Sequence, residues 1–352
     1  MNAYEINDIR TDKDFVGISF SGFKKTHVKK ELTQCLMKSA IEPACNWCAE
    51  LVASGHFIDV WDIIIIFVSR HIHLGCPKLP LYISIRIESF KSIISTGYVG
   101  NELNLRNNTT IRRLFAEIIA TLCCAQKRHS FDAIKIKKKE EFSLEIMTEK
   151  LKAPNVSFGT VAFKDDDPKE IFIAINEFSY HLSKNNVNEY SACYWLEWLL
   201  EFDIVCKRKK SPIKAVRRNT NIIEPNNQTD CIWIIWDIIK YYAKEKDCVA
   251  TIKIIDALFD MYCLKFSAGT KTRRKYIIYN CISLLTEVVD LTIPIWKDKL
   301  QISDIVDKIM VVYKEIKKNE QSPKKNYLLN GTDRSNLDKT RERIEIINKI
   351  LN

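Results

Sequence analysis

Glycine and proline are scarce in this sequence of 352 residues, which contains 9 of each. Glycine makes up roughly 7% of an average protein, so turns that need a positive φ must be few in this chain. Hydrophobic residues, at 46%, and charged residues, at 28%, are nevertheless in ordinary proportion and can form a large core. A chain with few turn residues and a normal core is typical of a helical protein.

Long apolar runs are also missing. The longest unbroken run, at 63–68, ends before Ser69 and Arg70, whereas a helix that spans a membrane needs roughly 20 apolar residues. The N-terminal residues alternate charged with polar side chains and lack the apolar region of a secretory signal. We therefore expect no membrane contact and a location inside the cell, where the 12 cysteines stay reduced.

Motifs of catalysis are absent as well. The patterns G-x-G-x-x-G, H-E-x-x-H and G-x-S-x-G do not occur, and the segment GTKT at 269–272 lacks the upstream glycine of a phosphate-binding loop. No histidine has an evident nucleophile near it in the sequence. We therefore expect that the protein is not an enzyme and has no cofactor.

Five residues near one predicted hairpin fit either a metal site or core packing. These are Cys45, Cys48, His71, His73 and Cys76, and zinc accepts such ligands in tetrahedral geometry. Trp47 separates the two cysteines on a predicted helix, however, and no second C-x2-C follows. Small buried thiols pack like hydrophobic residues, so we interpret these residues as core and expect no metal.

The segment 42–80 predicts a helical hairpin around which the rest is organised. Pro43 suits a first helical turn, Gly55 ends the first helix, and Gly75 ends the second. Apolar residues at 81–94 alternate as in a strand but also match helical spacing, and we predict a helix there. Further helices are predicted at 24–39, 111–127, 168–182, 187–208, 229–246, 249–266, 272–289, 302–318 and 335–351, with Asn108 or Thr109 as the N-cap of the helix at 111–127.

The sequence therefore predicts an all-α protein, an array of antiparallel helical hairpins of the HEAT kind with little or no sheet. We expect an N-terminal arm at 1–23, a first helical half at 24–128, a connector with one short helix at 129–167, a second helical half at 168–319, and a linker with a charged helix at 320–352. Asp167, followed by Pro168, predicts the start of the second half. The expected core aromatics are Trp47, Trp61, Phe115, Trp195, Trp198, Trp233 and Trp236.

Basic residues, in a chain of net charge +10, supply the candidate binding site. Two clusters make up this site: Lys207, Arg208, Lys209, Lys210, Lys214, Arg217 and Arg218, and then Arg273, Arg274 and Lys275. The helix predicted at 24–39 carries four more lysines within seven residues. Such clusters bind nucleic-acid phosphates with salt-dependent affinity. They also fit a solvated surface that complements helix C-termini, or an acidic protein partner, and exposed tryptophans beside them would favour nucleic acid.

Segments spread over nearly the whole chain carry a resemblance to known proteins. They are DFVGISFSGFKK, the 42–80 hairpin, RRLFAEII, KLKAPNV, DDPKEIFIAINEFSYHLS, SACYWLEWLLEFD, WIIWD and SLLTE. They resemble an uncharacterised protein family encoded by nucleocytoplasmic large DNA viruses, the giant viruses. This resemblance implies a viral source and carries no functional residues with it.

A narrower resemblance covers the hairpin alone. Its residues are Trp47, Ala49, Leu51 and Gly55, followed by Ser69, Ile72, Leu74, Gly75 and Pro77. In this order they are similar to the helical collar of clamp-loader-type AAA+ proteins, without the ATPase module that precedes a collar. The resemblance implies a collar-like alternative to the HEAT-like array, and a surface for oligomerisation or docking.

Together these observations predict a function in binding. We expect a non-enzymatic scaffold or adaptor that binds viral or host proteins within a viral assembly. One alternative is a nucleic-acid-binding accessory factor in viral replication, transcription or translation, and another is a minor capsid or virion protein. The expected location is the viral factory in the cytoplasm of the infected host cell, with the virion as the alternative.

Overall fold

Helices dominate the computed structural model, which describes residues 4–137, 142, 144–218 and 223–321. Helix makes up 63% of the structure, and these ranges contain no strand. Ile18 and Lys24 form a single isolated β-bridge. The all-α prediction is thus confirmed. The helix predicted at 335–351 lies outside the described residues. No described helix combines the length and the apolar character needed to cross a membrane.

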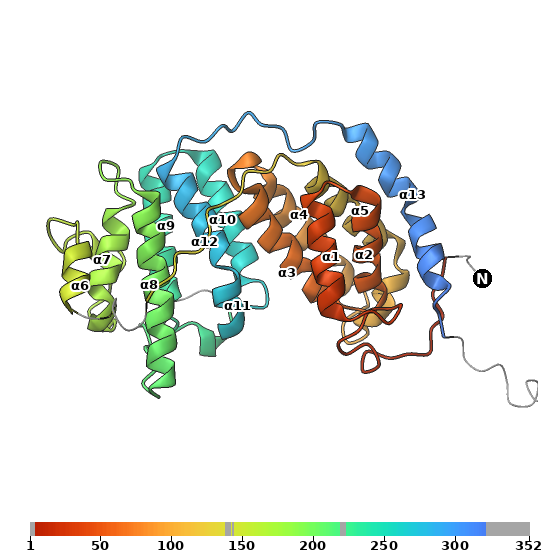
Figure 1. Ribbon diagram of the computed structural model, residues 1–352, viewed down its shortest axis with the longest axis horizontal. Helices are drawn as coiled ribbons and strands as arrows, with labels where there is room; N and C mark the ends of the chain where they lie inside the picture. Colours follow the sequence, from red (N-terminus) through yellow and green to blue (C-terminus); the bar gives the residue numbers. More distant parts are fainter. Residues whose placement is uncertain (1–3, 138–141, 143, 219–222, 322–352) are drawn as a thin grey trace, which may run out of the picture.

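The first half of the chain forms five α-helices in succession (Figure 1). They are α1 (Lys25–Met37), α2 (Ile41–Ala53), α3 (Phe57–Phe67), α4 (Leu79–Ser95) and α5 (Thr109–Cys124). The helix predicted at 81–94 is α4, so helical spacing prevails over strand spacing there. Asn108 caps α5, because its side-chain oxygen accepts a hydrogen bond from the Ile111 N–H at 3.1 Å. Gly55 follows α2 with a φ of +78°, the left-handed conformation that commonly ends a helix.

The connection between α3 and α4 departs from regular α-helix. It consists of a π-helical turn (Val68–Ile72), a 3-10 turn (His73–Gly75) and a short loop. His73 has a φ of +48°, which is uncommon for a residue other than glycine. A Cβ atom on Gly75 would lie 2.4 Å from the carbonyl oxygen of Gln126. Glycine is therefore required for the segment that follows α5 to pass this close to the turn.

The second half contains the short helix α6 (Leu144–Lys150) and six further α-helices. These are α7 (Phe172–Tyr180), α8 (Glu189–Arg208), α9 (Ile232–Glu245), α10 (Val249–Cys263), α11 (Ala268–Arg273) and α12 (Lys275–Thr286). The sequence predicts a single helix at 272–289, whereas the structure breaks it at Arg274. In Figure 1, α11 lies at the lower end of α12.

Asp167 does not cap a helix, contrary to the prediction. A 3-10 turn (Lys169–Ile171) comes first, and α7 begins only at Phe172. The Asp167 carboxylate instead accepts two hydrogen bonds from the Arg218 guanidinium, at 2.7 and 2.8 Å. A buried guanidinium that binds both oxygens is a stronger partner than the free N–H groups of a helix start. The local sequence pattern cannot reveal a partner 51 residues away.

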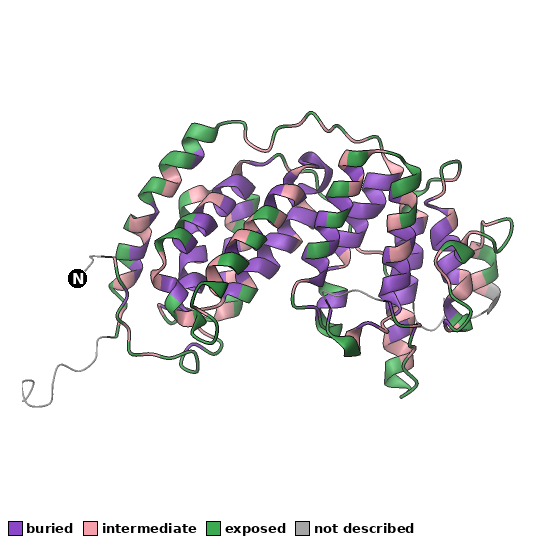
Figure 2. Cartoon of the chain, turned by 180° about the vertical axis from the view of Figure 1, so that it is seen from behind, coloured by how far each residue is buried: buried purple, intermediate pink, exposed green. Residues whose placement is uncertain are grey.

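The predicted core aromatics are buried with one exception. Trp61, Phe115, Trp195, Trp198, Trp233 and Trp236 are buried, and Figure 2 shows buried residues along the inner faces of the helices in both halves. Trp47 is half-buried, with the rings of Phe23 and His27 at centroid distances of 5.5 and 5.8 Å. The halves meet where α10 packs on α4 and α12 packs on the π-helical turn, so one core runs through both.

The last described helix, α13 (Lys299–Lys317), returns to the first half and packs on α5 and α2 (Figure 1). The Arg112 guanidinium of α5 lies 4.1 Å from the ring centroid of Tyr313, which is buried. The sequence groups this helix with the second half, at 168–319. The structure packs it on the first half because the partners of its apolar face are there.

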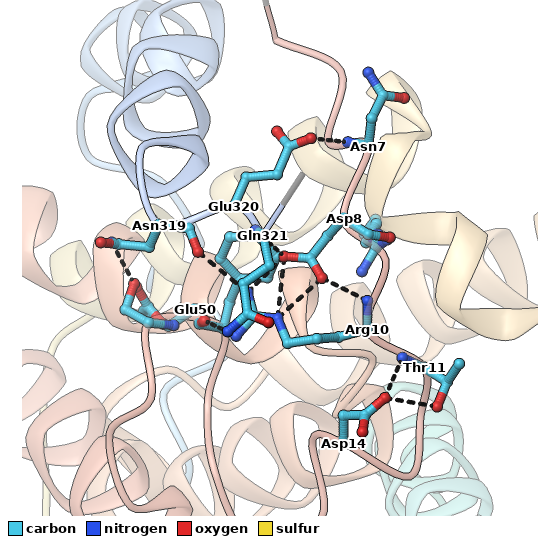
Figure 3. A network of polar contacts seen from close by, with 12 residues as sticks. Asn7, Asp8, Arg10, Thr11, Asp14, Glu50, Asn319, Glu320 and Gln321 are labelled. Atoms are coloured by element: carbon cyan, nitrogen blue, oxygen red, sulfur yellow. Dashed lines mark hydrogen bonds and ion pairs between the residues drawn. The ribbon is translucent and has the colours of Figure 1, made fainter. Parts of the chain in front are cut away.

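The N-terminal arm is tied to the end of α13 (Figure 3). We call this contact between residues 7–10 and 319–321 the terminal clasp. The Asp8 carboxylate accepts a hydrogen bond from the Gln321 N–H at 3.0 Å. The Arg10 guanidinium binds Asp8 and also donates to the Asn319 carbonyl oxygen at 3.2 Å. The clasp thus joins segments 313 positions apart in the chain.

Candidate functional site: a basic cleft between the halves

Two of the predicted basic residues are buried in ion pairs. Arg218 is 5% exposed and lies 2.7 Å from Asp167 and 3.0 Å from Asp237. Arg274 is 2% exposed and donates to Asp62 at 2.6 Å and to backbone carbonyl oxygens at the end of α10. Both side chains hold the fold together. Neither side chain is therefore part of the surface that a partner could contact.

The neighbours of Arg274 in the predicted cluster differ from each other. Lys275 lies 2.8 Å from Glu197 of α8, and 17% of its side chain is exposed. Arg273 has a 56% exposed side chain and a longer contact, 3.4 Å, with Asp62. Of the three predicted positions at 273–275, Arg273 is thus the one that presents its charge to solvent.

The remaining predicted residues are exposed: Lys207, Arg208, Lys209, Lys210, Lys214 and Arg217. We call the first four the α8 tip, because they lie where α8 ends and projects from the molecule (Figure 1). Positive charge at this end complements the helix dipole. Arg217 donates to the side-chain oxygen of Gln228 at 2.5 Å, whereas Arg208 forms no ion pair within the described part of the chain.

A cleft of about 360 Å³ lies between α1, α3 and α11. Lys29 and Lys30 of α1 and Arg273 of α11 provide its cations, and Ile66 and Phe67 of α3 contribute to an apolar wall. We call it the basic cleft. It brings together two basic segments that belong to different halves of the chain.

Carboxylates near the basic cleft are outnumbered on the α1 side. Asp59 is shared by two lysines, with Lys29 at 2.6 Å and Lys25 at 3.0 Å. Burial acts to raise the pKa of Asp59, but the hydrogen bonds from Lys29 and Lys25 outweigh it and lower that pKa. Lys30 is exposed and forms no ion pair among the described residues. This side of the cleft therefore carries surplus positive charge.

The same imbalance holds on the α11 side. Asp62 is shared by Arg273 and Arg274, at 3.4 and 2.6 Å. Because the shorter contact goes to the buried Arg274, Asp62 is mostly engaged in holding the interior. Arg273 is thus incompletely neutralised and free to attract an anion.

Helix α11 also connects the basic cleft to the α8 tip. Lys271 of α11 and Lys207 of the α8 tip both donate to the Asp203 carboxylate, the latter at 2.7 Å. In Figure 1, α11 lies between α8 and the first half. We call the set formed by Lys29, Lys30, Arg273 and the α8 tip the basic track.

His71 lines the basic cleft without adding charge at neutral pH. Its Nδ1 lies 3.1 Å from the Nδ1 of His129. Burial lowers the pKa of His71 to about 4, and the positive charge of Arg70 acts in the same direction. The imidazole is therefore a neutral polar group in the wall of the cleft.

The five residues weighed as zinc ligands do not converge. Cys45 and Cys48 are buried in α2, and burial raises the pKa of the Cys45 thiol to about 12. His73 lies 3.2 Å from the Ser283 hydroxyl, in a different contact from that of His71. In the described ranges, no three His, Cys, Asp or Glu side chains are grouped as metal ligands would be.

Lys29 and Lys30 are absent from the site that the sequence predicts. The run of lysines in the first predicted helix indicates a basic surface there. The sequence does not reveal that this surface faces α11. Tryptophan adds nothing to the basic track, since all seven tryptophans are buried or half-buried. Contact with bases by stacking on tryptophan is therefore not part of this site.

A second hollow, of about 820 Å³, lies between the start of α2 and α13. Ile41, Ile305 and Val311 line it together with the acidic side chains Glu42 and Asp304. Val311 is 58% exposed. We call it the α2–α13 groove.

No protein-family model, curated protein or solved structure matches this chain.

Proposed function

We propose that this chain is a non-enzymatic, α-helical binding protein, and that the basic track holds the phosphate backbone of a nucleic acid. One observation carries the proposal. Cations from α1 and α11, which lie in different halves of the chain, meet in one cleft with too few carboxylates to neutralise them. In this role the protein would be an accessory factor in replication, transcription or translation.

A nucleic acid fits the basic track better than a single small anion does. Two groups of exposed cations, one in the basic cleft and one at the α8 tip, are joined by the short helix α11, whose buried Lys271 shares Asp203 with Lys207. A chain of phosphates presents one negative charge after another and could reach both groups. The track offers lysine charges and two exposed guanidinium groups, those of Arg208 and Arg273, with no exposed tryptophan on which a base could stack. Contacts of this kind position a backbone without reading its sequence.

The test is a titration of a fluorescently labelled DNA duplex, followed by anisotropy at several salt concentrations. The variant Lys29→Gln/Lys30→Gln/Arg273→Gln removes three charges from the basic cleft. Its matched control, Lys184→Gln/Lys253→Gln/Lys314→Gln, removes three exposed charges outside the basic track. We expect weaker binding for the first variant and nearly unchanged binding for the second. Equal effects of the two variants would reject the basic cleft as the contact.

The α2–α13 groove supports a second candidate, an adaptor that binds a protein. Its volume lies within the range of roughly 300–1,000 Å³ of binding pockets, and an apolar groove of this kind accepts an amphipathic helix. Two acidic residues of the lining, Glu42 and Asp304, outnumber its basic residue, Lys308, which favours a partner helix with basic residues beside its apolar face. The viral resemblance makes a viral assembly in the host cytoplasm, or the virion, the proposed setting.

This second candidate is tested by affinity purification of the tagged protein from infected cells, with nuclease treatment. A partner of the groove should survive nuclease, be lost from Val311→Glu, and be kept by Val249→Glu. Val249 is 66% exposed on α10, outside the groove, and so controls for an added surface charge. A partner that Val311→Glu retains does not occupy the groove.

A further inference from the structure

The α2–α13 groove has the length of a short helix. On α13 its lining runs from Gln301 to Val312, and the start of α2 forms the opposite wall. At 1.5 Å per residue, this part of α13 is about 17 Å long, which corresponds to about three helical turns. The described residues leave the apolar surface of the groove partly uncovered. Its partly or fully exposed apolar side chains are Ile41, Pro43, Ile305, Val311 and Val312.

The charged side chains of the lining are mainly acidic. Glu42 and Asp304 line the groove together with one basic residue, Lys308. Asp304 is exposed, and neither carboxylate forms an ion pair in the described part of the chain. A segment that fills this groove therefore needs apolar residues on one helical face and a positive net charge.

Residues 322–352, which follow the last described residue, contain such a segment. Lys or Arg occupies seven of these positions and Asp or Glu occupies four, so their net charge is positive. Within the helix predicted at 335–351, apolar residues recur at spacings of seven, three and four, as on one face of a helix. They are Leu337, Ile344, Ile347 and Leu351. The sequence of this segment thus complements the groove in both polarity and charge.

The end of α13 places this segment within reach of the groove. The last described residue, Gln321, is held at the terminal clasp by its hydrogen bond to Asp8. From the end of α13 at Lys317, the far end of the groove at Gln301 is about 24 Å away along the helix. Residues 322–334 span up to about 40 Å when extended. This tether is long enough to return the segment to any part of the groove, and a short tether raises the local concentration of the segment to roughly millimolar.

We propose that residues 335–351 dock as an amphipathic helix in the α2–α13 groove of the same chain. The apolar face with Ile344 and Ile347 packs on the apolar wall, and the basic residues beside this face lie near Glu42 and Asp304. The contact is autoinhibitory, because a protein partner of the groove must displace the segment before it binds. The docking itself requires neither that partner nor the basic track, so it goes beyond both candidate functions.

A photo-crosslinker in the full chain tests the contact. p-Benzoylphenylalanine is introduced at Lys308, which lines the groove, or at Ser303, an exposed position of α13 outside the lining. After illumination, digestion and mass spectrometry identify the crosslinked peptides. We expect position 308 to crosslink to residues 335–351, and position 303 to give little of this product. Absence of the product at position 308, or equal yields at both positions, would overturn the proposal.

A pair of variants in the segment shows whether one helical face makes the contact. Ile347→Glu places a charge on the apolar face, and Ile346→Glu places the same charge on the far side of the predicted helix. In the chain with the crosslinker at position 308, the crosslink should be lost with Ile347→Glu and kept with Ile346→Glu. Equal yields from the two variants would mean that the segment does not dock through this face, and the proposal would be rejected.

The mass of the crosslinked product identifies the occupant of the groove. A product with the mass of one chain supports docking within the chain, whereas a product of twice that mass would make a second copy the occupant and overturn the proposal.

The purification from infected cells tests the second candidate function separately. If a partner binds the groove, Ile347→Glu should increase the recovery of that partner, because the segment no longer competes with it. Unchanged recovery would contradict the autoinhibitory role. A crosslink without a partner would refute the adaptor alone, and a partner without the crosslink would refute the docking alone.

Discussion

Asp62 and Arg274 form an ion pair of 2.6 Å that joins α3 to the start of α12, although 212 residues separate them in the chain. The guanidinium of Arg274 is buried. Its Nη2 group donates to Asp62, and its Nη1 group donates to the carbonyl oxygen of Tyr262 at the end of α10. A buried charge of this kind is tolerated because its counter-charge is in place. The pair therefore fixes how the two halves meet.

Removal of the carboxylate should be strongly destabilising. We expect Asp62→Asn to lower the free energy of unfolding by about 3–5 kcal/mol, because it leaves the Arg274 charge buried without a counter-charge. Urea denaturation at neutral pH measures the effect. The control is Asp307→Asn, which breaks an exposed pair with Arg113 and should cost about 0–1 kcal/mol. Similar losses in the two variants would contradict a special role for Asp62.

His73 should make stability depend on pH between about 6.5 and 4. Burial, with the charge of Arg128 as a second cause, lowers the pKa of His73 to about 4, whereas an unfolded histidine titrates near about 6.5. The unfolded chain binds more protons in this window, so the free energy of unfolding should fall as the pH is lowered, by up to about 3 kcal/mol.

The variant His73→Asn isolates this contribution, because asparagine tolerates the positive φ of this position and does not titrate. Its free energy of unfolding, measured by urea denaturation at pH values across the window, should depend less on pH. An unchanged pH dependence would assign the effect to other groups.

Cys248 should be the fast-reacting thiol of the native protein. It precedes the first turn of α10, and interactions with Thr251 lower the pKa of its thiol, while burial raises the pKa of every other thiol. The thiolate is the reactive form. One equivalent of a disulfide reagent should therefore react quickly at neutral pH, and Cys248→Ser should abolish that phase. A fast phase that persists in the variant would disprove the assignment.

Acid should open the terminal clasp before the core unfolds. Burial acts to raise the pKa of Asp8, but hydrogen bonds from Arg10 and from the Gln321 N–H outweigh it and lower that pKa. A carboxylate with a lowered pKa contributes stability above its unfolded pKa and loses it as the pH falls through the folded value. Hydrogen exchange at the Ile9 N–H, which donates to the Gln321 carbonyl oxygen at 3.1 Å, should therefore lose protection below about pH 4. Asp8→Asn should show this loss already at neutral pH.

Nucleic-acid binding by the basic track should show a defined salt dependence. If Lys29, Lys30 and Arg273 each neutralise one phosphate, the triple glutamine variant should reduce the slope of log affinity against log salt by about three. Anisotropy titrations over a range of salt concentrations give this slope. A change in affinity without a change in slope would place the three residues outside the phosphate contacts.

Helix positions in this chain follow from local signals that the sequence contains. The apolar stripe and the Asn108 cap predict α5, and helical spacing at 81–94 predicts α4 in spite of an alternation that also suits a strand. Local signals were insufficient at Asp167, whose side chain binds Arg218 and so leaves α7 to begin at Phe172. The local pattern favours a helix start at this point, but the ion pair with the distant Arg218 guanidinium occupies the carboxylate that would cap the helix.

The candidate site could be predicted only in part for the same reason. A basic residue looks alike in the sequence whether it is exposed, as Lys209 is, or buried against a carboxylate, as Arg274 is. Which lysines face one another depends on how α1 and α11 are placed by the whole fold. The return of α13 to α2 and α5 also depends on long-range contacts, which no periodicity reveals.

That return of α13 has a consequence for how the chain can be divided. A protease cut in the connector at 129–167 would separate the halves covalently, but α13 would remain docked on α2 and α5, and the terminal clasp would still hold the arm. The two fragments are therefore expected to stay together as a complex, and to find each other again when they are produced as separate chains. The fold can thus be assembled from two complementary fragments, because α13 of the second fragment packs on α2 and α5 of the first.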